Sequence, residues 1–312
     1  MINKPLITVI GANPAWQKTL FFREFIPGRV NRAYKEENYS SGKGVNFCRA
    51  LRCSELGESI LLQFAGGVNG KRHCDGLDAA GFRHKTVVTA AETRNCITCL
   101  DDAGNMSELI GVSEKITGSE SDEFIKYLQE VLPETDLLAI TGSLPDGSDP
   151  ELYHRAAELA ATAGIPLLID ALAGVDGVLS RKNLTVLKVN QEEFFKITSC
   201  NEIISAHRIA QKRYPGKIFA VTNGADSATL SAAGVLYEYS LPEIKVVSPL
   251  GAGDTASAVM SALIAVKTPP AEAFLQALAA ASANCMNAVA GEFSPENSRC
   301  IAAQIKMKSQ AL

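Results

Sequence analysis

The chain has 312 residues, of which 46% are hydrophobic and 21% are charged, enough to bury the core of one large or two modest globular units. Its formal net charge of −4 argues against an extended nucleic-acid-binding surface. No apolar run reaches the length of a membrane span, and Lys4 and Pro5 interrupt the N-terminus before a secretory apolar region can form. We therefore expect a cytosolic protein that binds neither nucleic acid nor membrane.

Apolar runs alternate with helical patterns along most of the chain. The predicted strands are residues 6–11, 60–65, 137–141, 166–170, 186–189 and 218–222. The predicted helices are residues 44–56, 69–80, 121–132 and 151–162, further helices up to Arg213, and two helices that finish the chain. Such alternation predicts an α/β fold with a doubly wound, mostly parallel sheet flanked by helices. Ligands of such sheets collect beyond the carboxyl ends of the strands.

Two β-rich stretches, residues 21–34 and 84–110, interrupt this alternation. We interpret them as the two parts of a small β lid, bounded at about 13–35 and 84–111. No linker or low-complexity tract divides the rest, so residues 1–312 are expected to form a single domain. The lid is too short to form its own core, and its strands would leave unpaired edges and an apolar face. We therefore expect a homodimer built through the lids.

Eight cysteines raise the alternatives of disulfides or a metal site. Cys96 and Cys99 form a C-x-x-C motif, but the sequence around them alternates as a strand does. Residues three apart on a strand face opposite sides of the sheet, which argues against a shared metal. The four histidines are scattered along the chain. Reduced, buried thiols are the interpretation that we prefer.

The turn formed by Gly251, Ala252, Gly253 and Asp254 is the most informative motif. The apolar residues 244–247 predict a strand before it, and residues 255–266 predict a helix after it. The peptide N–H groups of the first three residues would then face an anion at the positive end of the helix dipole. Asp254 adds a base that can accept a proton from a hydroxyl while the N–H groups stabilise a transferred phosphoryl group.

The same turn also fits a loose dinucleotide fingerprint, with Glu272 about twenty residues further on. However, Glu272 follows two prolines and opens a helix, whereas that fingerprint requires an acid at the end of a strand. Asp254 would also repel a pyrophosphate. A purely structural turn is the other alternative.

A second cluster, residues 40–46, also stands at the start of a predicted helix. Gly42 and Gly44 let the backbone approach a ligand, and Lys43 between them adds a cation beside a helix N-terminus. This pattern favours a phosphate or a polyhydroxylated ligand. The chain contains no G-x-x-x-x-G-K-[ST] motif, so this cluster is not a Walker P-loop.

Several motifs in chain order carry a resemblance to a known family. They are Asn13-Pro14-Ala15, residues 41–46 (SGKGVN), Thr93-Arg94, residues 142–147 (GSLPDG), residues 188–193 (KVNQEE) and residues 251–254 (GAGD). Over nearly the whole chain, their order and spacing resemble the PfkB (ribokinase-like) carbohydrate kinases, and within them the 1-phosphofructokinase and tagatose-6-phosphate kinase branch. The resemblance implies a ribokinase-like fold, ATP and Mg²⁺ as cofactors, and a sugar phosphate as the partner substrate.

The resemblance also implies roles for individual residues. Asp254 would be the catalytic base, with Gly251, Ala252 and Gly253 as the anion hole. Asn190 and Glu193 match the N-x-x-E element that supports magnesium through its water shell, which suits an ion that retains several waters. The other positions that match the nucleotide site are Lys188, Thr222, Gly224 and Asn284.

On the acceptor side, Gly42, Lys43 and Asn46 match the sugar-binding turn, and Arg94 and Ser143 match groups that hold the phosphate already on the sugar. Arg29 matches a basic position that reaches the substrate from a neighbouring subunit. Gln17 replaces the aspartate that usually grips sugar hydroxyls. Its amide still donates and accepts hydrogen bonds but lacks the charge that strengthens them.

The resemblance and the two cations on the acceptor side indicate an ATP-dependent kinase of a hexose monophosphate. Fructose 1-phosphate, converted to fructose 1,6-bisphosphate, is the first expectation. Tagatose-6-phosphate or fructose-6-phosphate kinase is the alternative. A catalytically silent sugar-phosphate-binding protein is a third, which the intact base and anion hole disfavour.

Overall fold

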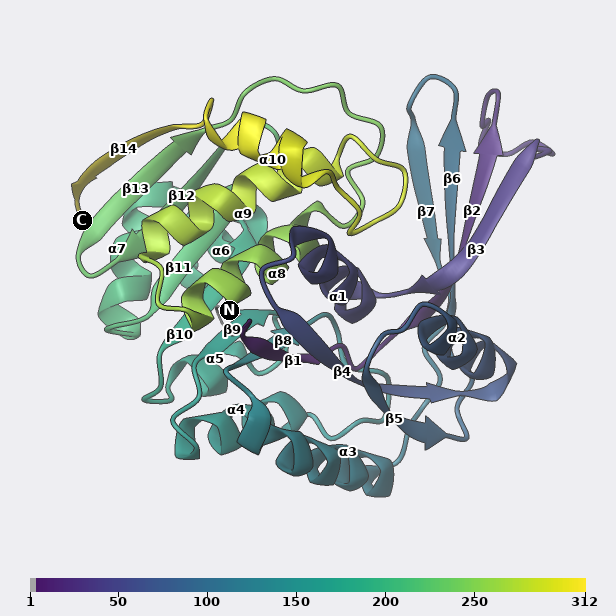
Figure 1. Ribbon diagram of the computed structural model, residues 1–312, viewed down its shortest axis with the longest axis horizontal. Helices are drawn as coiled ribbons and strands as arrows, with labels where there is room; N and C mark the ends of the chain where they lie inside the picture. Colours follow the sequence, from purple (N-terminus) through teal and green to yellow (C-terminus); the bar gives the residue numbers. More distant parts are fainter. Residues whose placement is uncertain (1–3) are drawn as a thin grey trace.

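The computed structural model describes residues 4–312, and within them a ten-stranded sheet runs through the molecule with helices on both faces (Figure 1). In spatial order its strands are β14 (Lys306–Ala311), β13 (Val235–Ser240), β12 (Ser227–Ala232), β11 (Ile218–Asn223), β10 (Thr185–Asn190), β9 (Leu167–Asp170), β8 (Leu137–Thr141), β1 (Leu6–Ile10), β4 (Glu58–Gly66) and β5 (His84–Thr89). The strands from β11 to β5 pair in parallel, and β12, β13 and β14 continue the sheet in antiparallel pairs. This confirms the predicted fold class.

Helices cover the two faces in two groups (Figure 1). One group comprises α1 (Lys43–Ser54), α2 (Gly67–Ala79), α8 (Ala252–Ala265), α9 (Pro270–Asn284) and α10 (Pro295–Ala302). The other comprises α3 (Gly118–Val131), α4 (Leu152–Thr162), α5 (Val175–Leu179), α6 (Gln191–Thr198) and α7 (Ile203–Arg213), with a short 3-10 turn at Leu132–Glu134. Among residues 4–312, none of these helices combines the length and apolarity that crossing a membrane requires.

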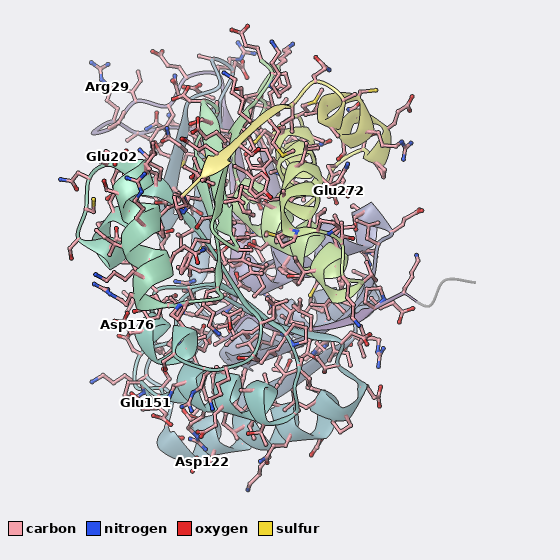
Figure 2. The ribbon with its side chains drawn as sticks, turned by 90° about the vertical axis from the view of Figure 1, so that its left-hand side faces the viewer. Arg29, Asp122, Glu151, Asp176, Glu202 and Glu272 are labelled. Atoms are coloured by element: carbon pink, nitrogen blue, oxygen red, sulfur yellow. The ribbon has the colours of Figure 1, made fainter. Side chains whose placement is uncertain are left out.

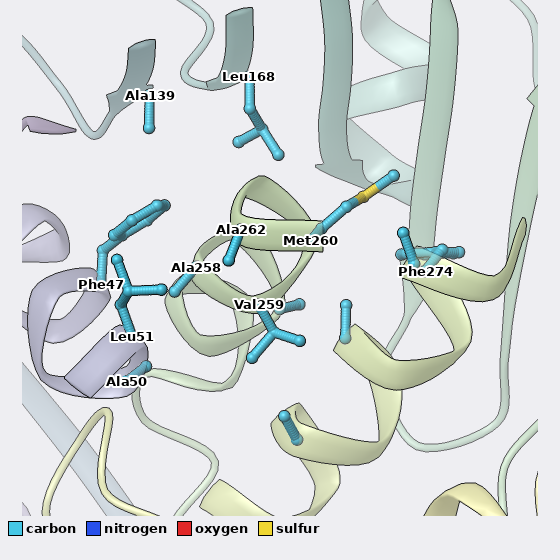
Figure 3. Packing of buried hydrophobic residues seen from close by; sticks show 14 of the residues in the cluster. Phe47, Ala50, Leu51, Ala139, Leu168, Ala258, Val259, Met260, Ala262 and Phe274 are labelled. Atoms are coloured by element: carbon cyan, nitrogen blue, oxygen red, sulfur yellow. The ribbon is translucent and has the colours of Figure 1, made fainter. Parts of the chain in front are cut away.

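The core is split between the two faces because strand side chains alternate. In β8, Leu137 and Ala139 join the cluster under α1, α8 and α9, whereas Leu138 and Ile140 join the cluster under the opposite helices. Small side chains on α8 let it pack closely against Phe47 and Leu51 of α1 (Figure 3). The helices that carry the two glycine motifs are therefore anchored side by side.

A second sheet, four-stranded within the same described residues, stands apart from the large one (Figure 1). Its order is β3 (Lys35–Ser41), β2 (Ala15–Phe22), β6 (Asn95–Asp101) and β7 (Met106–Ile110). This sheet is the expected lid, but its bounds differ from the prediction. Strand β5, which begins at His84, belongs to the large sheet because α2 returns the chain to pair in parallel with β4.

Two further predictions about elements are wrong. Residues 244–247 do not form a strand; the backbone N–H of Val247 donates to the carbonyl of Cys285 at the end of α9 instead. The chain does not finish with two helices, because β14 follows α10. Helix α8 also begins at Ala252, which puts Asp254 inside its first turn.

The cysteines are free thiols. Cys96 and Cys99 lie on β6, as the alternation predicted, and both are buried. The expectation that the thiols are buried holds for Cys48, Cys96 and Cys99, whereas Cys300 is exposed and the other four are only half-buried. In residues 4–312, no group of three or more His, Cys, Asp and Glu side chains forms a metal cluster.

Candidate active site

A cavity of about 940 Å³ lies at the carboxyl ends of the parallel strands, between the large sheet and the lid. Thr141, Asp170 and Asn190, which end β8, β9 and β10, all line it. Most of the predicted site residues line the same cavity: Gln17, Gly42, Lys43, Asn46, Arg94, Ser143, Lys188, Asn190, Glu193, Thr222, Gly224, Gly251, Gly253 and Asp254. The fold thus brings motifs from opposite ends of the chain to one place.

Asp254 is 6% exposed and occupies the third position of α8, behind Gly251 in a left-handed conformation. Its Oδ2 accepts a 2.8 Å hydrogen bond from Nδ2 of Asn46. Burial raises the pKa of Asp254 above its ordinary value and the charge of Asp170 adds to this, while Lys43, Asn46 and Lys188 oppose it. A buried carboxylate with a raised pKa is a stronger base.

Asp170, which sequence reasoning missed, holds two predicted lysines together. Its Oδ1 lies 3.1 Å from Nζ of Lys43, and its Oδ2 lies 3.0 Å from Nζ of Lys188. Burial opposes the ionisation of Asp170, but Lys188 and Lys43 outweigh it and lower the pKa to about 2. Asp170 in turn raises the pKa of Lys43 above its ordinary value, against the effect of burial. Two fixed ammonium groups therefore face the cavity.

Backbone geometry explains the glycines at the start of α1. Gly42 has φ 113°, and a Cβ there would lie 2.9 Å from Cα of Pro14. A Cβ on Gly44 would lie 2.7 Å from Cα of Gly11. Only glycines let the helix start reach the end of β1, so that Lys43 and Asn46 enter the cavity.

The glycine turn before α8 differs in one respect from the prediction. Gly251 and Gly253 line the cavity, but Ala252 does not, and its N–H donates to the carbonyl of Pro249 at 3.3 Å. Of the three residues predicted to form the anion hole, Gly251 and Gly253 line the cavity. A Cβ on Gly253 would lie 2.8 Å from Nζ of Lys188, so the ammonium group sits directly against this turn.

Asn190 and Glu193 form a capping box at the start of α6. The Oδ1 atom of Asn190 accepts from the N–H of Glu193 at 2.8 Å, and Oε2 of Glu193 accepts from the N–H of Asn190 at 3.0 Å. Both residues line the cavity. One carboxylate and one amide oxygen suit Mg²⁺, which completes its coordination with waters and substrate phosphates.

The lid contributes Gln17, which is 2% exposed and donates from Nε2 to Oγ1 of Thr98 at 2.8 Å. Asn13 contacts both Arg94 and Ser143, the residues predicted to hold the substrate phosphate. Its carbonyl accepts from Arg94 at 3.1 Å, and its Nδ2 donates to Oγ of Ser143 at 3.3 Å. Nε of Arg94 is buried and has no hydrogen-bond partner within residues 4–312.

Besides Ala252, two predicted site residues do not line the cavity. Arg29 is exposed and projects from the loop between β2 and β3 (Figure 2). Asn284 is fully buried; it donates to the carbonyl of Leu250 at 2.9 Å and accepts from the N–H of Gly291 at 2.6 Å. This geometry favours a structural role for Asn284, holding the glycine turn, over contact with a nucleotide. Glu272 lies in the first turn of α9, not at a strand end, which argues against the dinucleotide alternative (Figure 2).

Sequence reasoning also missed Ser257, whose hydroxyl oxygen lies 2.9 Å from Oδ2 of Asp170 and 3.0 Å from the carbonyl of Gly253, so that it can donate to either. Asp170 ends a predicted strand, and a carboxylate at a carboxyl strand end is a signal that could have identified it. Ser257 carries no such signal, because its role depends on the packing of α8 over β9.

The site joins a buried carboxylate at a helix N-terminus to two nearby ammonium groups, an arrangement that suits transfer of a phosphoryl group to an alcohol. Residues 5–297 match the family described as pfkB family carbohydrate kinase. The chain belongs to this family, and it is a sugar kinase.

Solved structures share this fold at low sequence identity. Phosphofructokinase-2 from Escherichia coli, in complex with potassium, is 21% identical with a TM-score of 0.87, covering 97% of this chain and 99% of that one. The same enzyme in complex with fructose-6-phosphate gives 20% identity and a TM-score of 0.86, covering 97% and 99%. A protein from Thermotoga maritima described as a possible 1-phosphofructokinase is 18% identical with a TM-score of 0.81, covering 98% and 99%.

Proposed function

We propose that the protein transfers the γ-phosphoryl group of ATP to a hexose monophosphate, with fructose 1-phosphate as the acceptor and fructose 1,6-bisphosphate as the product. The observation that carries this proposal is Asp254, a carboxylate 6% exposed at a helix N-terminus with Lys43 and Lys188 beside it. Membership of the carbohydrate kinase family supports the reaction class.

In the proposed step, the acceptor hydroxyl oxygen forms a bond to the γ-phosphorus, and the bond from that phosphorus to the bridging oxygen of ADP breaks. The hydroxyl proton passes to Asp254, and ADP leaves with the electron pair of the broken bond. Gly251 and Gly253 line the cavity, and their N–H groups would stabilise the charge that develops on the phosphoryl oxygens. Lys188, held by Asp170 against Gly253, adds a fixed positive charge.

The nucleotide would bind along the ends of β10 and β11. Asn190, Glu193, Thr222 and Gly224 line that side of the cavity. When bound, Mg²⁺ would neutralise phosphate charge, with Glu193 and Asn190 holding its water shell. Their capping box orients both oxygens before any ligand arrives.

The acceptor would bind between α1 and the lid, with Gly42, Lys43, Asn46 and Gln17 at its hydroxyls. Arg94 and Ser143 would hold the phosphate that it already carries, because a guanidinium group can grip a phosphate through two parallel hydrogen bonds. Arg94 lines the cavity, and its Nε has no hydrogen-bond partner among the described residues, which supports this role. Lys43 and Arg94 both line the cavity, and two cations there favour a phosphorylated sugar.

Fructose 6-phosphate is the second candidate, because a structure sharing this fold is a complex with that compound. The test is ATP consumption measured with fructose 1-phosphate, fructose 6-phosphate, tagatose 6-phosphate and unphosphorylated fructose. We expect fructose 1-phosphate to give the highest kcat/KM. Preference for unphosphorylated fructose would contradict the phosphosugar assignment, and no turnover with any sugar would favour the silent binding protein.

We also propose that two chains pair through their lids. Several apolar side chains at the lid are exposed: Val30 (81%), Tyr34 (60%), Leu109 (55%), Ile110 (61%) and Val112 (84%). Strands β3 and β7 are open edges of the four-stranded sheet. A second lid would cover both features and would bring Arg29 towards the acceptor site of the partner.

A further inference from the structure

Arg49 on α1 is a charged side chain that the proposed reaction does not use, yet it is only 8% exposed. Its guanidinium group donates to three neutral oxygens. Nη1 lies 2.6 Å from the carbonyl of Ala290 and 3.3 Å from Oδ1 of Asn46, and Nη2 lies 3.0 Å from the carbonyl of Ser40. Burial lowers the pKa of Arg49, although an arginine remains charged. The charge of Glu292 partly offsets this burial, but every hydrogen bond that holds the guanidinium group goes to a neutral oxygen.

The contact with Asn46 fixes the direction of an amide. Arg49 can only donate, and Oγ of Ser41 also donates to Oδ1 of Asn46, at 3.3 Å. With its oxygen committed to these two donors, the amide must direct Nδ2 to the opposite side. There it donates to Oδ2 of Asp254 at 2.8 Å. The remaining oxygen of Asp254 is left for an acceptor hydroxyl.

The other two contacts join Arg49 to the surroundings of the base. Ala290 packs against the glycine turn, since a Cβ on Gly251 would lie 2.7 Å from Cβ of Ala290. Ser40 lies near the end of β3, where the lid enters α1, and the ring of Tyr39 in the same strand lies 5.6 Å from the guanidinium carbon. Arg49 therefore contacts the lid, the sugar-binding turn and the wall behind the anion hole.

We propose that Arg49 is a positioning residue. It fixes the direction of the Asn46 amide, which leaves one oxygen of Asp254 free for the acceptor hydroxyl, and it ties this arrangement to the end of the lid strand β3. This inference rests on the proposed function of Asp254. Without Arg49, the Asn46 amide can rotate, and its donor no longer stabilises the ionised form of Asp254. The other charged groups that face Asp254 are Lys43 from α1, Asp170 from β9 and Lys188 from β10, and they stay in place.

The test compares Arg49→Met and Arg49→Lys with Arg52→Met. Arg52 lies one turn further along α1, stacks on the ring of Phe82 at 3.8 Å, and donates to the carbonyl of Ala80 at 2.6 Å, so it is an exposed arginine of the same helix whose contacts lie away from Asn46. We expect Arg49→Met to lower kcat about tenfold or more while the KM for ATP changes by no more than a few-fold. The kcat of Arg49→Lys should fall between those of Arg49→Met and the parent, because a single ammonium group cannot replace both Nη donors of the guanidinium group. Arg52→Met should match the parent.

The second readout needs no substrate. Carboxyl-carbon NMR of the aspartate-labelled protein identifies the Asp254 signal by its absence in Asp254→Asn. We expect its pKa to be higher in both Arg49 variants than in the parent, and unchanged in Arg52→Met. An unchanged pKa, or an unchanged kcat, in the Arg49 variants would overturn the inference. If Arg49→Met does not fold, Arg49→Lys alone decides. Parent-like turnover of Asp254→Asn would instead reject the proposed base, whatever the NMR result for Arg49.

Discussion

Asp170 balances two lysines at the centre of the cavity, and one of them, Lys188, is itself buried. One carboxylate therefore keeps two cations in fixed positions beside the base. Removing it would leave the buried Lys188 without its ion-pair partner, which is far more costly than losing an exposed ion pair. The stability of the site should consequently depend on the ionisation of this one group.

We predict that Asp170→Asn lowers the free energy of unfolding by about 3–5 kcal/mol at neutral pH. The pKa of Asp170 is lowered from 3.8 to about 2 by folding, so its charge stabilises the folded protein fully above about pH 4. This contribution is lost as the pH falls towards about 2. The gap between parent and variant should therefore shrink over that range in urea unfolding experiments.

The control is Asp122→Asn, which removes an exposed partner of Arg155 at 2.9 Å. An exposed ion pair contributes about 0–1 kcal/mol, so this variant should unfold almost like the parent. If Asp170→Asn were as harmless as the control at neutral pH, the balancing role of Asp170 would be wrong.

Residues whose chemistry is local could be predicted from the sequence, and those whose role depends on tertiary contacts could not. Asp254 and Lys43 stand in glycine turns whose backbone requirements are visible in the sequence itself. Arg49 and Ser257 lie inside helices, where nothing nearby distinguishes them from solvated or packed residues. For Asn284, the family resemblance suggested contact with the nucleotide. Its amide instead makes hydrogen bonds to Leu250 and Gly291 that hold the glycine turn.

At the scale of elements, the start of α1 depends on the contact between two glycines. A Cβ on Gly44 would lie 2.7 Å from Cα of Gly11 and equally close to a methyl group of Leu61. The backbone of Gly11 cannot make room for this Cβ unless the start of α1 moves. Because Lys43 and Asn46 enter the cavity from this turn, stability and turnover should fall together.

We predict that Gly44→Ala costs about 1–3 kcal/mol of stability and lowers kcat, as expected when a well-packed contact is overfilled. Gly118→Ala is the matched control, because it lies at the start of α3 with no heavy atom within 4 Å of its added Cβ. This control should leave stability unchanged or raise it by up to about 1 kcal/mol. Equal effects of the two substitutions, measured by chemical unfolding, would contradict the close-contact argument.

The sequence predicted most strands of the parallel sheet, because each is a short apolar run between turn signals. It did not predict β12, whose small and polar residues carry a weak β signal, although β12 pairs with both β11 and β13. Conversely, residues 244–247 were predicted as a strand but do not form one. Val246 and Val247 are 52% and 45% exposed, and hydrogen bonds to the end of α9 override their local preference for a strand.

At the scale of the whole molecule, the lid of a single chain has two open strand edges and exposed apolar side chains. We predict a two-fold dimer through the lids, in which Arg29 reaches the acceptor site of the partner. The measurement mixes Arg29→Ala with Asp254→Asn under conditions that let subunits exchange. A mixed dimer would contain one complete site, so activity should return.

Two results would reject this assembly. One is a strictly monomeric protein at working concentration, measured by sedimentation. The other is no recovery of activity despite demonstrated exchange and a clear defect in Arg29→Ala alone.

The central claim is that Asp254 removes the proton from the acceptor hydroxyl, and one comparison tests it most directly. Turnover and nucleotide affinity are measured for the parent and for Asp254→Asn, with the best sugar phosphate from the substrate screen. Loss of a general base predicts turnover lower by roughly a hundredfold or more, with ATP affinity nearly unchanged. Turnover within a few-fold of the parent would contradict the claim.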